Sequence, residues 1–274
     1  MSGPIHIVGT PIGNLEDITL RGLRTLREAD VIACEDTRHT RKLLTHYDIQ
    51  KPLVSCHEHN ELQRVGELIR RARSGESVAF VTDAGMPTIS DPGYRLVSAA
   101  IEQGVEVRVV PGPTAVESAI AISGLPSSSF RFIGFLPAKR GQRKKTLAAL
   151  AADRATIVCY ETPHRILAAL EDIQAELGDR PVTLAREMTK MHEEILRDDV
   201  SKVLAELNQR DRVRGEITLV IGPSAETATP DVDIPQRVAD LIESGRDRME
   251  AIKMAASEAG LSKREAYSLL EDEK

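Results

Sequence analysis

The stretch Ile5-His6-Ile7-Val8-Gly9-Thr10-Pro11-Ile12-Gly13-Asn14 decides the fold class of this chain. Its first residues form a short, almost entirely apolar run, which is typical of a strand buried on both faces of a sheet. Glycine and proline follow at once and favour a tight turn, because glycine permits unusual backbone angles and proline fixes its own. A helical pattern over residues 19–29 comes next, so the segment predicts the start of a strand-turn-helix unit.

The same alternation continues through the first lobe. Further strands are predicted at 31–34, 53–55, 78–82 and 105–110, and helices at 40–47, 61–74 and 94–103. Strands that alternate with helices indicate a parallel sheet covered on both faces. We therefore predict an α/β fold whose N-terminal lobe, residues 1–115, is built on a parallel sheet.

A second lobe of residues 116–224 is predicted after Pro111-Gly112-Pro113, which interrupts the regular strand-helix pattern. After a helix over 114–123 and a turn-rich stretch at 124–129, the patterns predict strands at 130–135, 156–160, 182–186, 194–197 and 216–221, and helices at 146–152, 164–177 and 200–208. The short gap between residues 186 and 194 leaves no room for a crossover helix. The second sheet is therefore expected to be mixed.

The remaining residues divide into a polar linker at 225–233 and a small α-helical extension at 234–274. Gly260 separates two helical patterns, and Ser262 with Glu265 forms a capping box, so a helix-turn-helix-like arrangement is predicted. Acidic residues outnumber basic ones beyond residue 237, which makes a packing or dimer-stabilising role as plausible as RNA contact. Lys263 and Arg264 are the residues to test there for RNA contact.

The composition is that of a soluble globular protein with room for more than one core. The 274 residues are 41% hydrophobic and 28% charged. Aromatic residues make up only 3%, and Trp is absent, which disfavours a stacking platform for single-stranded nucleic acid. Because the net charge is -6, the protein is not a basic nucleic-acid coat, and any RNA contact requires a local patch.

Cysteine usage and the apolar patterning indicate a cytoplasmic protein. Cys34, Cys56 and Cys159 are too few and too widely spaced for a disulfide framework or a cysteine-rich zinc site, so we expect reduced thiols. The N-terminus lacks the pattern of a signal peptide. The sequence holds no apolar stretch of about 18 residues that could span a membrane.

Four segments rich in glycine and proline fall at the expected carboxyl ends of strands, where open α/β sheets bind ligands. They are residues 9–14, 83–87, 91–93 and 111–115. The patterns that cradle nucleotide phosphates, G-x-x-x-x-G-K-[ST] and G-x-G-x-x-G, are missing there. The segments thus indicate a backbone-lined slot for a small charged cofactor. Taken singly, each also fits a tight strand-to-helix connection.

Two charged segments are candidates for substrate contact. Glu35-Asp36-Thr37-Arg38 follows the second strand, and three charged groups in four residues favour substrate contact, where Arg38 could grip a phosphate. The alternative interpretation is an N-cap with a charge pair at the helix start. Residues 139–145 contain five basic residues in seven, which favours phosphate contact over an ordinary solvated loop and helix start. His57 and His59 are interpreted as part of a substrate-facing loop, and no metal site is assigned.

Taken together, these segments resemble one known superfamily, the tetrapyrrole methylases. Within it, the chain resembles the branch that methylates the ribose 2′-hydroxyl of a cytidine in the decoding region of 16S ribosomal RNA. The resemblance covers roughly residues 4–222, and the tail is similar to the helical extension of that branch. It is carried by residues 8–15, 35–38, 57–61, 82–87, 91–93, 111–115, 160–165 and 186–190.

The resemblance implies a site for S-adenosylmethionine between the lobes. The cofactor-binding residues would be Asp83, Gly85, Met86, Ile89, Ser90, Thr114, Ala115, Tyr160, Glu187, Thr218 and Leu219. For Ile89, Thr218 and Leu219 a purely structural role is an equal alternative. The substrate-binding residues would be Thr10, Pro11, Asn14, Arg38, His57, His59, Lys139, Arg140, Arg143, Lys144 and Lys145.

The resemblance also implies a homodimer that acts on 16S RNA, either free or in the assembled 30S subunit. Two other functions stay open: a methyltransferase for a tetrapyrrole-type small molecule, and a non-catalytic RNA-binding module. The basic run and the extra tail favour RNA over a macrocycle. Intact glycine- and proline-rich turns argue against a module that has lost its cofactor.

Methylation of a weakly acidic hydroxyl requires alignment with the methyl donor and removal of one proton. The candidate catalytic bases are Asp36, Glu161 and Glu187, with His164 and Lys190 as further possibilities. Glu161 and Glu187 have an alternative structural role as partners of Arg165 and Arg186. A base is also dispensable if the proton leaves late.

Overall fold

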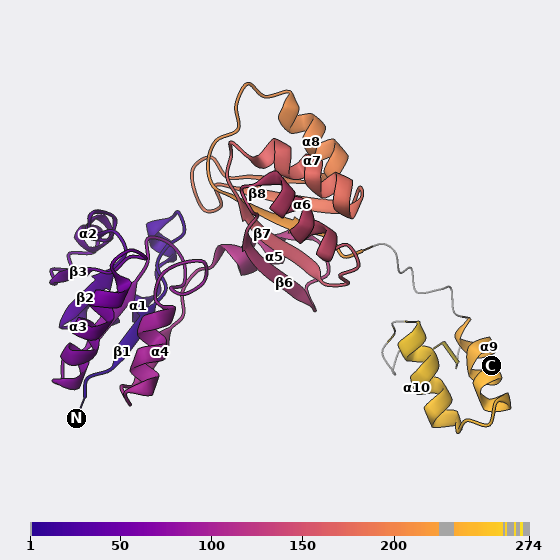
Figure 1. Ribbon diagram of the computed structural model, residues 1–274, viewed down its shortest axis with the longest axis horizontal. Helices are drawn as coiled ribbons and strands as arrows, with labels where there is room; N and C mark the ends of the chain where they lie inside the picture. The colour runs from indigo at the N-terminus through magenta and orange to yellow at the C-terminus, as the bar shows by residue number, and fades with distance from the viewer. Residues whose placement is uncertain (1, 225–232, 260, 262–265, 267–268, 271–274) are drawn as a thin grey trace. The chain divides into compact units, whose positions relative to one another are not determined.

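The computed structural model describes residues 2–224, 233–259, 261, 266 and 269–270. These residues belong to two compact units, residues 1–223 and residues 224–274, and the first unit contains two β-sheets (Figure 1). The first sheet has the strand order β3-β2-β4-β1-β5. Its strands are β1 (Ile5–Val8), β2 (Val31–Cys34), β3 (Leu53–Ser55), β4 (Val78–Val81) and β5 (Val107–Val110). All neighbouring pairs in this sheet are parallel, which confirms the prediction.

Helices cover both faces of this first sheet. Helices α1 (Leu20–Glu28) and α2 (Thr37–His46) bury their apolar stripes against one face, in a cluster that contains Leu26, Leu43 and Ile32. Helices α3 (Glu61–Arg73) and α4 (Tyr94–Glu102) pack against the other face. The double cover explains why the strands are apolar along their whole length and do not alternate.

Helix α2 begins at Thr37, three residues before the predicted start. Asp36 is its N-cap, and the carboxylate accepts a hydrogen bond from the Arg38 amide at 2.8 Å. A cap of this kind satisfies a backbone donor that the first helical turn cannot. The charged segment 35–38 therefore has a local structural function, which fits the alternative interpretation of an N-cap with a charge pair.

The second sheet is mixed, as predicted, with the order β6-β7-β10-β8-β9. Strands β6 (Phe130–Phe135) and β7 (Thr156–Glu161) are parallel, whereas β8 (Pro181–Arg186), β9 (Glu194–Asp199) and β10 (Ile217–Ile221) join through antiparallel pairs. Helix α5 (Ala115–Ser123) packs on one face of this sheet. Helices α6 (Arg140–Ala149), α7 (Ile166–Leu177) and α8 (Val200–Asn208) pack on the other.

Helix α6 begins at Arg140, well before the predicted start at residue 146. The basic run is thus helical and not a loop. Its first turn is held by α7, because Arg140 and Arg143 both pair with the fully buried carboxylate of Asp172. Sequence periodicity could not reveal this, because the anchoring carboxylate lies on another helix.

The second unit is a small helical body. Helices α9 (Ile234–Glu243) and α10 (Arg248–Glu258) pack through Val238, Leu241 and Ile252, and Arg237 pairs with Glu258 at 2.7 Å. Ser262, Lys263, Arg264 and Glu265, and most of the predicted linker, lie outside the described residues. Within the described ranges, no helix combines the length and apolar character needed to cross a membrane.

Candidate active site

The carboxyl ends of β1 and β4 form a topological switch point in the first sheet. The two strands are neighbours, but β1 leads to α1 on one face while β4 leads to α4 on the other. Connections that diverge in this way leave a crevice at the strand ends, where open α/β sheets bind ligands. Residues 9–14 and 82–93 lie at this crevice.

The two turns at the crevice are joined by backbone hydrogen bonds. Thr10 and Gly85 form an antiparallel bridge, with the Thr10 amide 2.9 Å from the Gly85 oxygen and the Gly85 amide 3.0 Å from the Thr10 oxygen. The Thr10 hydroxyl donates to the Thr82 carbonyl at 3.1 Å and is buried. Thr10 and Pro11 are both buried and are absent from the pocket lining, so in this structure they shape the turn, and their contact with a substrate stays a prediction.

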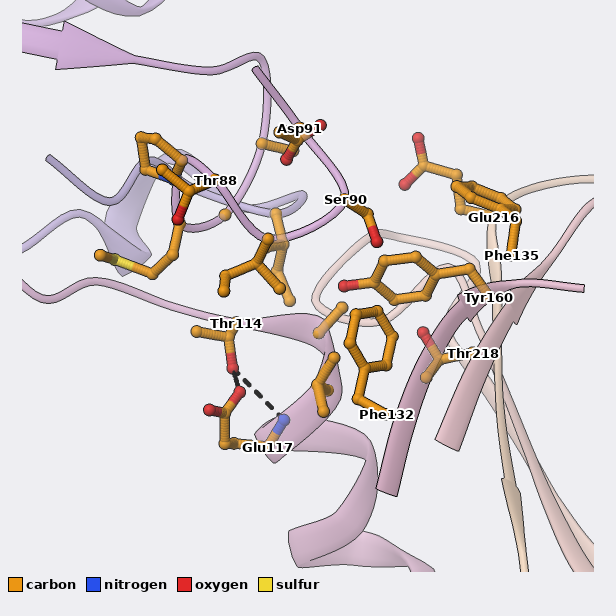
Figure 2. A pocket seen from close by; sticks show the side chains of 18 of the residues that line it. Thr88, Ser90, Asp91, Thr114, Glu117, Phe132, Phe135, Tyr160, Glu216 and Thr218 are labelled. Carbon is orange, nitrogen blue, oxygen red and sulfur yellow. Dashed lines mark hydrogen bonds between the residues drawn. The ribbon is translucent and has the colours of Figure 1, made fainter. Parts of the chain in front are cut away.

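A pocket of about 890 Å³ opens beside these turns, within the first unit (Figure 2). Pockets for small ligands usually fall between about 300 and 1,000 Å³ and combine apolar walls with a few polar groups. One side of this pocket includes residues 84–91 and 114–117, and the other includes residues on β6, β7 and β10. It therefore draws on both sheets.

An aromatic wall closes the side formed by the second sheet. Phe132 and Phe135 lie edge-on to Tyr160, with ring centroids 5.0 and 5.4 Å away (Figure 2). Gly134 adopts a left-handed conformation with φ 67° at the register shift of β6, and Ser90 approaches it closely. Burial raises the pKa of Tyr160 to about 12, so its hydroxyl stays neutral and can donate a hydrogen bond at physiological pH.

Thr114 closes another side of the pocket, at the N-terminus of α5. Its hydroxyl accepts from the Glu117 amide at 3.3 Å and also donates to the Glu117 carboxylate (Figure 2). The pattern Thr114-x-x-Glu117 resembles a capping box, in which a threonine and a glutamate satisfy the free donors of the first turn. Thr114 therefore fixes the start of α5 while it lines the pocket.

An acidic group lies along the strand-end loops, made of Glu35, Asp83 and Asp91. Asp83 accepts a hydrogen bond from the Asp36 amide at 3.2 Å. Burial, reinforced by the charges of Glu35 and Asp83, raises the pKa of Asp91 to about 7. Burial, together with the negative charge of Asp83, also raises the pKa of Glu35. Of the three, Asp91 lines the pocket.

Most of the predicted cofactor residues line this pocket. Those in the lining are Gly85, Met86, Ile89, Ser90, Thr114, Ala115, Tyr160 and Thr218. Asp83, Glu187 and Leu219 are absent from it. Thr218 and Leu219 are consecutive in β10, so their side chains point to opposite faces, and Leu219 is fully buried in the core of the second lobe. This position fits the alternative that Leu219 has a purely structural role.

The sequence-based assignment missed several lining residues. Asp91 belongs to a segment that the glycine and proline pattern marks, but its burial beside other carboxylates depends on packing. The aromatic pair Phe132 and Phe135 could have been noticed as the concentration of scarce aromatics in one strand. Glu117 and Glu216 also line the pocket, and no local pattern distinguishes them.

The loop at residues 187–190 joins the second lobe to the turn after β1. The Asn14 amide donates to the Thr189 hydroxyl at 3.1 Å. A Cβ placed on Gly13 would lie 2.6 Å from both Thr189 and Lys190, so glycine is required for this close approach. Glu187 and Thr189 have positive φ angles of 51° and 65°. Such strained backbone persists where surrounding contacts hold it and is frequent at functional sites.

Four of the five candidate bases are held in ion pairs, and for three of them, Asp36, Glu187 and Lys190, the pairing also shifts the pKa. The Arg38 guanidinium holds the pKa of Asp36 well below its usual range. Burial opposes ionisation of Glu187, but hydrogen bonds from the Glu216 amide and the Lys190 ammonium keep its pKa lowered. Burial likewise opposes the charge of Lys190, and its two carboxylate partners keep its pKa raised. These groups are weak proton acceptors in this arrangement.

Glu161 differs from the other candidate bases. Its Oε1 accepts from Arg165 at 2.6 Å and from the Thr162 amide at 2.7 Å, so the predicted pairing with Arg165 exists. Its Oε2 is buried and has no hydrogen-bond partner in the described part of the chain. Glu161 also lines the pocket. The other pairing differs from expectation, because Arg186 pairs with Glu194.

The predicted basic patch at residues 139–145 is largely neutralised. Arg143 is only 4% exposed and donates to Asp172 at 2.7 Å, so it is a core ion-pair residue and the prediction that it contacts phosphate is wrong. Arg140 shares the same carboxylate, and Lys144 pairs with Glu176 at 2.9 Å. Lys139 and Lys145 are exposed.

His57 and His59 lie on the loop before α3. Their rings meet edge to face at 5.9 Å, and the His57 amide donates to the Asn60 side chain at 2.8 Å. His59 is exposed and His57 is half-buried. Among the described residues, no three or more His, Cys, Asp or Glu side chains are arranged so that they could hold a metal ion. His164 is exposed next to Thr162.

Comparison with known protein families identifies one match. The family model described as Tetrapyrrole (Corrin/Porphyrin) Methylases matches residues 4–204. The chain is 43% identical over 277 residues to a Halalkalibacterium halodurans protein named ribosomal RNA small subunit methyltransferase I, covering 99% of this chain and 96% of that relative. The identity is 50% over 220 residues to the Thermotoga maritima protein of the same name, covering 80% and 98%.

Solved structures share the fold at lower identity. The methyltransferase CobJ superposes with a TM-score of 0.62 at 20% identity, covering 82% of this chain and 95% of that one. Uroporphyrin-III C-methyltransferase from Thermus thermophilus, complexed with S-adenosyl homocysteine, gives a TM-score of 0.55 at 22% identity, covering 82% and 99%. These similarities establish a shared two-lobed architecture.

Proposed function

The chain belongs to the family of tetrapyrrole (corrin/porphyrin) methylases, and from this membership we propose that it methylates 16S ribosomal RNA with S-adenosylmethionine. The proposed target is the ribose 2′-oxygen of a cytidine in the decoding region. The observation that carries the proposal is that relatives at 43% and 50% identity, which align with 96% and 98% of their own lengths, are named ribosomal RNA small subunit methyltransferase I.

The pocket fits S-adenosylmethionine in size and in chemistry. When bound, this cofactor supplies an electrophilic methyl group on a positively charged sulfur. The pocket offers about 890 Å³, an aromatic wall at Phe132, Phe135 and Tyr160, and a carboxyl at Asp91. Glu35 and Asp83 add negative charge nearby and favour a cationic ligand over a neutral one of the same shape.

The chain's own residues would orient the reactants and exclude water. The Thr10–Gly85 bridge and the Asn14–Thr189 contact hold the floor of the crevice, so a ribose could be presented in one orientation. Of the candidate bases, Glu161 is best placed to accept the hydroxyl proton, because it lines the pocket and its Oε2 is free of other partners in the described residues.

A tetrapyrrole-type small molecule is the second candidate substrate. The structural neighbours include a methyltransferase named for uroporphyrin-III, but at 22% identity that similarity concerns the fold alone. The ribosomal RNA relatives are about twice as similar in sequence and match nearly the whole chain. A non-catalytic RNA-binding role is less well supported, because the strand-end turns enclose a complete pocket.

We expect a homodimer that acts in the cytoplasm, where small ribosomal subunits are assembled. Exposed apolar side chains gather at the pocket rim, including Tyr94 at 73%, Val109 at 59% and Phe135 at 53%. A second copy could cover such a surface. Light scattering of the purified protein would give the assembly state directly.

The experiment that tests the function uses radiolabelled S-adenosylmethionine and 30S subunits from cells that lack the enzyme. Incorporation of one methyl group, mapped to a cytidine 2′-oxygen by mass spectrometry of nuclease fragments, supports the proposal. Free 16S RNA run in parallel identifies the preferred substrate form. Transfer to a porphyrinoid without transfer to any RNA would overturn it in favour of the second candidate.

A further inference from the structure

Helix α2 contains basic side chains that the structure leaves available. Residues 37–47 contain Arg38, Arg41, Lys42 and two histidines, but no acidic residue. Arg41 and Lys42 are exposed, and neither forms an ion pair in the described part of the chain. This contrasts with α6, where Asp172 and Glu176 neutralise three of the basic residues.

These side chains surround a hollow of about 580 Å³. Its lining consists of Leu15, Arg38, Arg41, Lys42, Thr45 and His46. The Arg38 side chain is 86% exposed. Its Nε and its Nη2 each donate a hydrogen bond to the Asp36 carboxylate. A guanidinium has five N–H donors, so others remain for an incoming acceptor. Asp36 therefore orients Arg38 without using all of its donors.

The hollow is connected to the active-site crevice by the chain itself. Leu15 directly follows the 9–14 turn, and the Tyr47 hydroxyl donates to the Leu15 carbonyl at 2.6 Å. Arg27 in turn donates to the Tyr47 carbonyl at 3.2 Å. At its other end, α2 begins beside Asp83, through the contact with the Asp36 amide. Both ends of the basic helix are thus tied to the strand-end turns.

We propose that Arg38, Arg41, Lys42 and His46, here called the α2 surface, bind backbone phosphates of the RNA strand that carries the target nucleotide. The inference rests on the proposed function. A protein with net charge -6 repels RNA overall and needs a local positive surface to attract it. Phosphate contacts of this kind position the strand without reading its sequence. An enzyme that modifies one nucleotide needs the strand to be positioned in this way beside its crevice.

The test compares two double variants with the parent enzyme. Arg41→Gln with Lys42→Gln removes two charges from the α2 surface. Arg70→Gln with Arg73→Gln is the matched control, because both are exposed on α3, which covers the opposite face of the sheet. The probe is the 30S subunit from cells that lack the enzyme, at several salt concentrations and saturating cofactor.

We expect the α2 variant to raise KM for the subunit about 10-fold, with S-adenosylmethionine affinity unchanged by calorimetry. Two lost phosphate contacts should also flatten the slope of log affinity against log salt by about 1.4 on a single strand. The control should match the parent in both. Thermal melting checks folding, and Lys42→Gln alone is the fallback if the double variant unfolds.

The outcomes separate the two proposals. If the parent methylates RNA and the α2 variant retains the parent KM and salt slope, the proposal that the α2 surface binds phosphates is wrong and the proposed function stands. If the parent methylates no RNA, the proposed function itself fails. Equal losses in the α2 variant and the control would show a general charge effect and would also overturn the α2 surface.

Discussion

Gly9 and Gly112 meet backbone to backbone at the carboxyl ends of β1 and β5. A Cβ added to Gly9 would lie 2.7 Å from both the Cα and the nitrogen of Gly112, and one added to Gly112 would lie 2.8 Å from Gly9. No side chain can occupy that space without moving one of the two turns. Since Gly9 starts the crevice floor and residue 112 precedes the pocket residue Thr114, the contact sets the spacing of the site.

Gly9→Ala is therefore expected to displace the crevice turns. Overpacking of this kind usually costs about 1–3 kcal/mol of stability. We expect S-adenosylmethionine affinity to fall at least about 10-fold, which corresponds to roughly 1.4 kcal/mol of binding free energy. Isothermal calorimetry measures this. Gly141→Ala, at an exposed helical position with open space around it, should leave affinity intact, and parent-like binding by Gly9→Ala would contradict the assignment.

The Arg143–Asp172 pair should contribute to stability and not to RNA binding. Both side chains are nearly inaccessible, at 4% and 0% exposure. Removing one partner of a buried pair typically costs about 3–5 kcal/mol, and the contact that Arg140 keeps with Asp172 places the expected cost at the lower end of that range. We expect Arg143→Gln to lower the free energy of unfolding by that order in urea titrations. Lys145→Gln, at an exposed position, should change it by less than about 0.5 kcal/mol. An unchanged unfolding midpoint for Arg143→Gln would count against this view.

Asp91 should make stability depend on pH. Its folded-state pKa of about 7 is above the usual carboxyl value of about 3.9. Between these values the folded protein binds a proton that the unfolded chain does not, so this group favours folding at low pH. That contribution is lost as pH rises through about 7. Asp91→Asn cannot ionise, so its Tm advantage over the parent should grow between pH 5 and pH 8.

The control for this pH dependence is Asp211→Asn, which removes an exposed carboxylate. Differential scanning calorimetry at several pH values should show a constant Tm difference for the control. A pH-independent difference for Asp91→Asn as well would mean that Asp91 is not perturbed by its neighbours.

Glu161→Gln tests the proton acceptor. The amide keeps the size of the side chain but cannot take up the proton, and loss of a general base commonly lowers rates 10²–10⁴-fold. We expect a drop in the single-turnover rate of about 100-fold, with cofactor affinity within a few fold of the parent. Arg165→Gln disturbs the Glu161–Arg165 ion pair but leaves the carboxylate in place. Equal rate losses in both variants would instead indicate a positioning role for Glu161.

Local sequence patterns are sufficient to predict the strand-helix alternation and the turns at the strand ends. Hydrophobic periodicity and the backbone preferences of glycine and proline are local properties, so the predicted bounds of β3, β6 and α8 coincide with the observed ones. The family-specific segments added the pocket residues on the 84–90 loop and at Tyr160, since they are contiguous in the chain.

The effect of distant groups on one another depends on how the chain packs in three dimensions. In the sequence, Arg143 belongs to a basic run typical of a surface, but in the structure it is buried and paired with Asp172 on another helix. In the sequence, Asp91 is an ordinary turn aspartate, but packing removes part of its water and places Glu35 and Asp83 nearby. No local pattern distinguishes the roles of Thr218 and Leu219. In β10, the Thr218 side chain faces the pocket and the Leu219 side chain faces the core. Burial and electrostatics depend on neighbours in space, which the order of residues along the chain does not specify.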